Sequence, residues 1–295
     1  MVTGALAATA VPTLLVLAVT FASPLGIGLL MGLDRKVTAS IQLRIGPPLL
    51  QPLYDLTKLL AKRANPADRL AAGLLSAQVV MAAGAVALLF AGADLVVAVL
   101  ILGVARVLFI LAAGAVESPF AQLGVGREII LLVIAEPLML LAAVAYGTVA
   151  GSFSVAAIAA AEPPALALPT LGLTLGVLLA IALRKSPFDI ATSHHAHQEL
   201  VKGSTTEMAG PWLALAELGH WFEIAFVVVF IALAAARLPI LAVGLIAATY
   251  AMTIVVDNTL PRATWRAALA VGWGLGGAAV IVALVLSQLL RAGGP

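Results

Sequence analysis

The 295-residue chain has 63% apolar and only 10% charged residues, and its mean hydropathy is +1.14. A water-soluble domain of this length cannot bury so much apolar surface, which excludes the soluble globular classes. The net charge of +2 and the pI near 9.2 do not indicate a nucleic-acid-binding protein, because the basic residues lie between apolar runs that are long enough to cross a bilayer.

The chain begins with a long segment that carries no charge. No charged side chain occurs in residues 1–33, and the run 2–31 is long enough to span a membrane, with Pro24 as a kink. A cleavable signal peptide is the alternative. It is disfavoured because the segment lacks a basic leading region and its apolar stretch is too long.

Seven further charge-poor runs follow, and the pair Pro163-Pro164 marks the boundary before the fifth span. The sequence therefore predicts a single-domain, all-α integral membrane protein of about eight transmembrane helices. The expected spans are 2–31, 70–93, 95–116, 129–150, 165–183, 208–236, 238–256 and 267–290.

Lysine and arginine residues gather in alternate loops. The loops after the first, third, fifth and seventh spans hold thirteen of the sixteen, whereas the opposite side has only Arg237 and Arg291. Arg106 lies inside the third span. The positive-inside rule places the four charged loops in the cytoplasm and both termini outside.

The first charged loop contains a segment, 49–63, in which leucines recur at three- and four-residue spacing and charged side chains occupy the other positions. This pattern predicts an interfacial amphipathic helix. It can serve as an anchor alone, or as a docking shelf for a soluble partner. The docking residues on and before it would be Arg44, Asp55 and Lys58.

Ionisable residues inside the spans are the strongest functional signal, since each costs roughly 2.5–3.5 kcal/mol at mid-bilayer. Glu128 and Glu136 are eight residues apart, about 12 Å along a helix and 80° around it, so both can face one cavity. Pro137 leaves a carbonyl free beside Glu136 and makes room for water. The candidates are Arg106, Glu128, Glu136, Glu217, His220 and Glu223.

Glu217, His220 and Glu223 recur every three residues over about 9 Å of one helix. Together with the acids of the fourth span they lead inward from the cytoplasmic side, and His220 can accept or donate a proton near neutral pH. The alternative is that these groups form buried ion pairs, such as Arg106 with Glu136, that only fix helix packing.

Two absences bear on cofactors. With no cysteine the chain holds no disulfide, no thiolate-bound iron–sulfur cluster and no c-type haem, so we expect any electrons to be carried by other subunits. The third charged loop contains His194, His195, His197 and Glu199, but none of the strong zinc patterns is present. We expect no metal there, and instead a histidine-rich docking or proton-collecting surface.

At this point the sequence resembles a known family: subunit 1 of NADH:quinone oxidoreductase (complex I) and its relatives in energy-converting membrane-bound hydrogenases. The resemblance runs from the first charged loop to the sixth span. Its motifs are Arg44-Ile-Gly-Pro, Gln51-Pro-Leu-Tyr-Asp55-Leu-Thr-Lys58, Gly126-Arg-Glu128, Glu136-Pro137, Ser186-Pro-Phe-Asp189, and Glu199-Leu-Val-Lys-Gly203 to Thr206-Glu207.

Within this family the third loop departs from the quinone-reducing branch, because Ala191-Thr-Ser-His-His-Ala-His-Gln198 replaces most of an acid-rich stretch. This form and His220-Trp-Phe-Glu223 look like the branch of group 4 nickel–iron hydrogenases and formate hydrogenlyase-type complexes. The resemblance implies a subunit of a membrane-bound oxidoreductase in the cytoplasmic membrane of a prokaryote, with iron–sulfur clusters and a nickel–iron centre in partner subunits and with antiporter-like membrane partners.

The predicted function is therefore a membrane anchor that couples electron transfer in a docked arm, of the ferredoxin and hydrogen type, to translocation of H⁺ or Na⁺. In this hypothesis Asp189, Glu199 and Glu207 respond to electron transfer and pass charge to the buried acids. A quinone-binding subunit is one alternative. A stand-alone secondary transporter is another, but the two halves of the chain show no convincing repeat.

Overall fold

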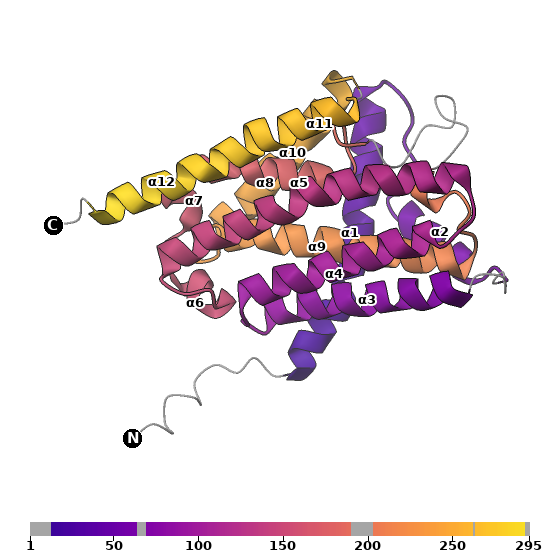
Figure 1. Ribbon diagram of the computed structural model, residues 1–295, viewed down its shortest axis with the longest axis horizontal. Coiled ribbons are helices and arrows are strands. Elements are labelled where there is room, and N and C mark those ends of the chain that lie inside the picture. The colour runs from indigo at the N-terminus through magenta and orange to yellow at the C-terminus, as the bar shows by residue number, and fades with distance from the viewer. Residues whose placement is uncertain (1–12, 64–68, 190–202, 262, 293–295) are drawn as a thin grey trace.

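The computed structural model describes residues 13–63, 69–189, 203–261 and 263–292 (Figure 1). Within them all regular secondary structure is helical, which confirms the all-α class. The elements are α1 Thr13–Ile41, α2 Gln51–Leu60, α3 Arg69–Phe90, α4 Leu95–Gly114, α5 Pro119–Ala150, α6 Val155–Ala160, α7 Pro164–Ala167, α8 Leu171–Ala182, the short helix η1 Gly203–Thr205, α9 Pro211–Leu233, α10 Pro239–Thr259, α11 Trp265–Val271, the π-helical turn η2 Gly272–Gly277 and α12 Ala278–Ala292.

Seven helices in the described residues are long and apolar enough to cross a membrane, so the expected count of eight is not confirmed. The difference lies at the expected fifth span, 165–183, where Pro169 separates α7 from α8. Proline cannot supply the backbone N–H that would continue the helix. The 12 residues of α8 extend over about 18 Å, less than the ~30 Å of a hydrocarbon core.

The first helix ends ten residues later than the sequence suggested. It continues through Asp34, Arg35 and Lys36 to Ile41, and its 29 residues correspond to a length of about 44 Å. This exceeds the ~30 Å thickness of a hydrocarbon core, so the charged end of α1 extends beyond the apolar region. Charge alone was therefore a poor marker of where this helix ends.

Helix α9 occupies the middle of the bundle (Figure 1), where it contacts α1, α2, α3, α8 and α10. Its most apolar window is 67% buried, more than that of any other candidate span in the described residues. The Tyr146 hydroxyl of α5 donates a hydrogen bond to the carbonyl of Phe230 at 3.0 Å. Side chains on α9 can therefore meet those of several helices at once.

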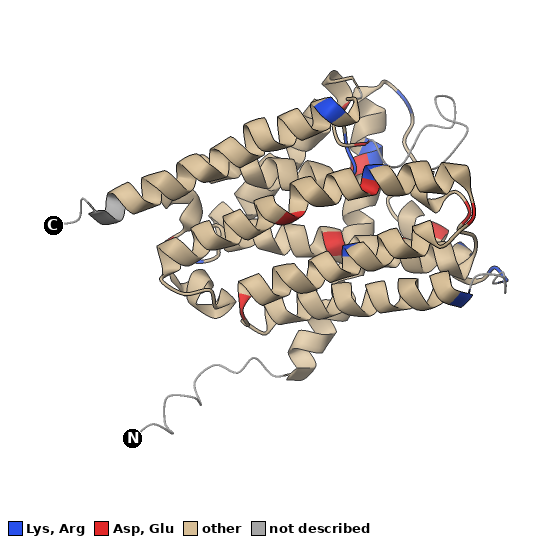
Figure 2. Ribbon diagram, in the orientation of Figure 1, with Lys and Arg blue, Asp and Glu red and all other residues tan. Residues whose placement is uncertain are grey.

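Charged side chains gather at one end of the bundle (Figure 2). We call this the charged end; it includes α2, η1, the start of α9 and the connection from α10 to α11. Helix α2 confirms the helix expected in the first charged loop, and its Leu53 packs near Gly28 of α1 and Trp221 of α9. Arg44 and Lys58 are exposed beside it, while Asp55 lies 3.5 Å from Arg35.

A buried ion cluster ties three segments together at the charged end. The Lys185 ammonium, on the segment after α8, lies 2.8 Å from Asp34 of α1 and 3.2 Å from Asp257 of α10. The backbone N–H of Ser186 donates to Asp257 at 2.9 Å. Only 7% of the Lys185 side chain is exposed, and it compensates two carboxylates whose side chains are 18% and 27% exposed.

The ion cluster makes a stability prediction. Replacing Lys185 by Met should cost up to about 3–5 kcal/mol, because it leaves two largely buried carboxylates without their cation. Replacing Arg35, whose pair with Asp55 is about half exposed, should cost about 0–1 kcal/mol. Thermal unfolding in detergent should therefore show a large fall in Tm for Lys185→Met and little change for Arg35→Met; equal effects would contradict the buried cluster.

Candidate functional site

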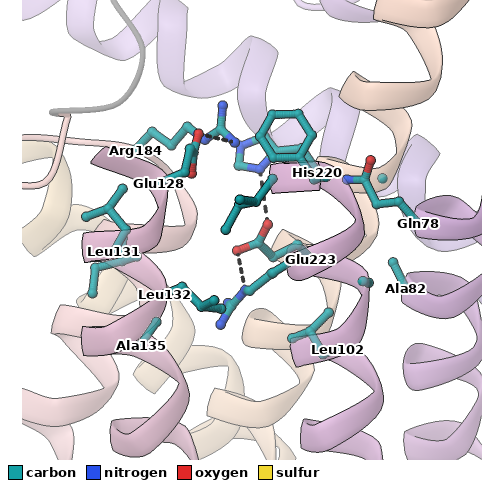
Figure 3. A pocket seen from close by; sticks show the side chains of 16 residues that line it. Gln78, Ala82, Leu102, Glu128, Leu131, Leu132, Ala135, Arg184, His220 and Glu223 are labelled. Atoms are coloured by element: carbon teal, nitrogen blue, oxygen red, sulfur yellow. Dashed lines mark hydrogen bonds and ion pairs between the residues drawn. The ribbon is translucent and has the colours of Figure 1, made fainter. Parts of the chain in front are cut away.

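A pocket lies between α3, α4, α5 and α9, beside the end of α8 (Figure 3). It offers about 40 Å³ to the centres of water molecules, and both apolar and ionisable side chains line it. Its polar lining consists of Gln78, Arg106, Glu128, Arg184, His220 and Glu223. Glu136 lies next to this pocket as a partner of Arg106.

Arg106 of α4 is the central cation. Its Nη1 donates to Glu136 of α5 at 2.8 Å, and its Nε donates to Glu223 of α9, also at 2.8 Å. Only 10% of the Arg106 side chain and 17% of each carboxylate side chain are exposed. The planar guanidinium can satisfy two carboxylates in fixed directions, which an ammonium ion does less well.

Gly103 makes room for this arrangement, one turn before Arg106 on α4. A Cβ atom at this position would lie 2.9 Å from Oε2 of Glu136 and 3.0 Å from its Cδ. Real Cβ contacts are essentially never that close, so a larger residue would displace the carboxylate. On α5 the helix continues through Pro137 without ending.

His220 extends the charged row along α9. Its Nδ1 lies 3.5 Å from Oε2 of Glu223, the oxygen that does not face Arg106 (Figure 3). The two residues are three apart in sequence and therefore neighbours on the helix surface. A protonated His220 thus forms an ion pair with a carboxylate that Arg106 already holds.

Glu128 begins the row nearer the charged end. Its Oε1 lies 3.1 Å from Nη2 of Arg184 and accepts a hydrogen bond from the Ser204 hydroxyl at 3.2 Å. Arg184 lies two residues after α8 in the left-handed region, with φ 50°, which is uncommon for a residue other than glycine. Ser204 belongs to η1, whose backbone lies against Gly124 of α5.

The structure gathers five of the residues predicted from sequence: Glu128 and His220 line the pocket, and Arg106 joins Glu136 and Glu223. The pairing of Arg106 with Glu136 is the one that the packing alternative named as its example. The second partner of Arg106, Glu223, was not expected from the sequence.

Glu217 is half-buried but does not line the pocket. From the sequence, Glu217 was expected on one face of the helix with Glu223. Six residues, however, correspond to 600°, so the two side chains point about 120° apart. Glu207 is exposed next to η1, and Asp189 is half-buried after α8. His194, His195, His197 and Glu199 lie outside the described residues.

Sequence reasoning missed three contributors. Gln78 on α3 is 5% exposed and lines the pocket. It was missed because a single uncharged polar residue does not stand out in an apolar run. Arg184 was counted only for topology. Gly103 had no signal except its three-residue spacing from Arg106.

Chemically, the site is a row of acids and cations suited to moving protons. Its contacts form two groups: Glu128 pairs with Arg184, and His220, Glu223, Arg106 and Glu136 follow one another in a second set. Members of both groups line the same pocket. In the part of the chain that the structure describes, no group of three His, Asp or Glu residues is arranged to hold a metal ion. Buried carboxylates and histidine are the usual groups of intramembrane proton relays.

Comparison with known proteins agrees with this architecture. A search of curated proteins finds no match. The fold is similar to that of a chain in the solved structure of the membrane-bound sulfane sulfur reductase, an archaeal respiratory membrane complex. The TM-score is 0.82 at 22% identity, over 94% of this chain and all of that one. A family model described as NADH dehydrogenase matches residues 13–288. The chain therefore belongs to the NADH dehydrogenase family, as a membrane subunit of a respiratory oxidoreductase complex that corresponds to subunit 1 of complex I.

Proposed function

We propose that this chain is the membrane-anchor and coupling subunit of a redox-driven ion pump. It docks an iron–sulfur and catalytic arm at the charged end and links electron transfer there to translocation of H⁺ or Na⁺. One observation carries this proposal: two groups of paired ionisable residues meet at one pocket, Glu128 with Arg184 near the charged end and the group that ends at Glu136 inside the bundle.

The position of Glu128 supports a link to the docked arm. Its two partners, Arg184 and Ser204, come from the two sides of the third charged loop. A displacement of this loop by the arm would change the hydrogen bonds and the charge around one carboxylate. Asp189 and Glu207 stand at the same two sides and would sense the arm first.

Inside the bundle, the contacts of Arg106 support the passage of a charge change from α9 to α5. Each carboxylate that it holds belongs to a different helix, and Glu223 also faces His220. Protonation of either acid weakens its attraction to the guanidinium and strengthens the competing pair. A charge change near Glu128 can therefore shift Arg106 between Glu136 and Glu223. Antiporter-like partner subunits would receive this change as a movement of charge.

The exposed side of α2 supports docking. Its inner leucines cover α1 and α9, while Arg44 and Lys58 face outward beside the half-exposed pair of Arg35 and Asp55. We place this surface in the cytoplasm of a prokaryotic cell, with both termini outside, on the positive-inside argument.

The electron-transfer chemistry assigned to the arm is ferredoxin-dependent reduction of protons to hydrogen, or its reverse. Purification of the complex in mild detergent should recover iron–sulfur proteins and a nickel–iron large subunit with this chain. A complex that lacks such a subunit and reduces a quinone would contradict the hydrogenase assignment. Recovery of the chain alone would contradict the coupling role itself.

The coupling role predicts a separation of electron transfer from pumping. In vesicles containing the complex, Glu136→Gln should abolish ion uptake driven by reduced ferredoxin while the complex still assembles, because Glu223 still compensates Arg106. Glu162→Gln makes the same change on an exposed residue after α6 and should leave uptake intact. Full uptake by Glu136→Gln, measured with an internal pH or sodium dye, would refute the coupling path.

A second prediction moves the same carboxylate without removing it. Gly103→Ala should reduce ion uptake several-fold, because the added methyl group displaces Glu136 from Arg106. Gly84→Ala is the matched control, since a Cβ atom there meets nothing within 4 Å. Equal uptake in the two variants would show that the position of Glu136 does not matter.

A further inference from the structure

Two buried polar atoms on the pocket make no hydrogen bond in the described part of the chain: Oε1 of Gln78 on α3 and Nδ1 of His220 on α9. This Nδ1 lies 3.5 Å from Oε2 of Glu223 and pairs with it only when the imidazole is protonated. Gln78 is only 5% exposed, and both residues line the same pocket. Buried polar groups are nearly always satisfied, by protein or by ordered water, so these two atoms indicate a polar ligand between α3 and α9.

A glycine on α9 leaves the space that the Gln78 side chain occupies. A Cβ atom on Gly219 would lie 2.7 Å from the Gln78 amide carbon, so the amide occupies space that any larger residue on α9 would fill. Gly219 directly precedes His220 in α9. Helices α3 and α9 thus bring an amide and an imidazole to the same pocket, in which Glu223 lies next to His220 (Figure 3).

The size of the pocket suits water. It offers about 40 Å³ to water centres, and about 10–15 Å³ is enough for one molecule that has two to four polar partners. A water molecule can donate to Oε1 of Gln78 and to Nδ1 of a neutral His220, and it can accept from a nearby cation. Both unpartnered atoms would then be satisfied.

We propose that Gln78 and His220 hold an ordered water that carries protons between the Glu128–Arg184 pair and the Glu223–Arg106–Glu136 group. This inference rests on the proposed function, and it assigns Gln78 as a positioning residue of the path. The species that passes through this pocket is then the proton.

The proton step conserves atoms and charge. The O–H bond of a protonated Glu128 breaks as a proton joins the water, and the water gives one of its own protons to Nδ1 of His220. Glu128 becomes a carboxylate, the imidazole becomes an imidazolium next to Glu223, and the water is unchanged. The imidazolium faces Glu223 at 3.5 Å, which stabilises the charge where it arrives.

The charges of the site argue against sodium at this point. Each of the three carboxylates already faces a guanidinium at 2.8 to 3.1 Å. A sodium ion at these oxygens would lie close to Arg106 or Arg184 and be repelled in a medium of low dielectric constant. A neutral water carries no such cost.

The first test compares three variants of the complete complex in vesicles, with reduced ferredoxin as donor and an internal pH dye. Gln78→Met keeps the shape but removes the acceptor, and should reduce proton uptake to background while electron transfer continues. Gln78→Glu restores an oxygen at the same place and should recover uptake well above that of Gln78→Met. Gln288→Met makes the same change on an exposed face of α12 and should match the wild type.

Two results would overturn the proposal: wild-type uptake by Gln78→Met, or an equal loss in Gln78→Met and Gln78→Glu. Measuring Glu136→Gln in the same experiment distinguishes a failure of the water site from a failure of the coupling function. If it abolishes uptake while Gln78→Met does not, the water site fails and the coupling function stands. If neither variant loses uptake, both fail.

The second test does not depend on activity. A cryo-electron microscopy map of the complex that resolves waters elsewhere in the membrane interior should show density within hydrogen-bond distance of both Gln78 and His220. The same map of Gln78→Met should lack it. A wild-type map without this density would overturn the assignment, even if a variant failed to assemble.

Discussion

The buried guanidinium of Arg106 is the interaction on which the rest of the site depends. It compensates one carboxylate from α5 and one from α9, at 2.8 Å each, where only 10% of its own side chain is exposed. Without it two acids would have to be neutral or the helices would separate, because an isolated charge at this depth is too costly. The same contact joins α4, α5 and α9 through one cation, as the packing interpretation expected for Arg106 and Glu136. It also belongs to the charged groups on which the proposed coupling role rests.

A second constraint is the way the charged end is fastened to the bundle. Lys185 holds the segment after α8 to α1 and α10, while η1 rests against α5 at Gly124. Arg184 directly precedes Lys185, and Ser204 itself lies against Gly124; both contact Glu128. One carboxylate thus lies where two fixed segments converge, which is a favourable place to convert a displacement into a change of charge.

Much of the fold was readable from the sequence, because apolar length and charge asymmetry are local properties. Long spans such as α3 and α4 lie close to their expected bounds. Prediction failed where tertiary contacts decide the outcome. Pro169 shortened α8, and the ion cluster of Lys185 and Asp34 lies where charge suggested that α1 had ended.

The candidate site was predicted in part for the same reason. Charged residues in apolar runs are visible in one dimension, so Arg106, Glu136 and Glu223 stood out. Their mutual orientation was not visible: helical rotation turns Glu217 away from the pocket, and the pocket's Gln78 carries no charge to mark it. The partner of Glu128 was equally hidden, since Arg184 is distant in sequence and reaches it only through the turn after α8.

The small residues have a consequence for recognising relatives of this chain. Gly103 and Gly219 each stand opposite a polar side chain on another helix, Glu136 and Gln78 respectively. A relative that keeps the carboxylates but carries a bulky residue at either glycine could not hold the same geometry. The pairs Gly-x-x-Arg on α4 and Gly-His on α9 therefore form a more discriminating fingerprint of this site than its acids do.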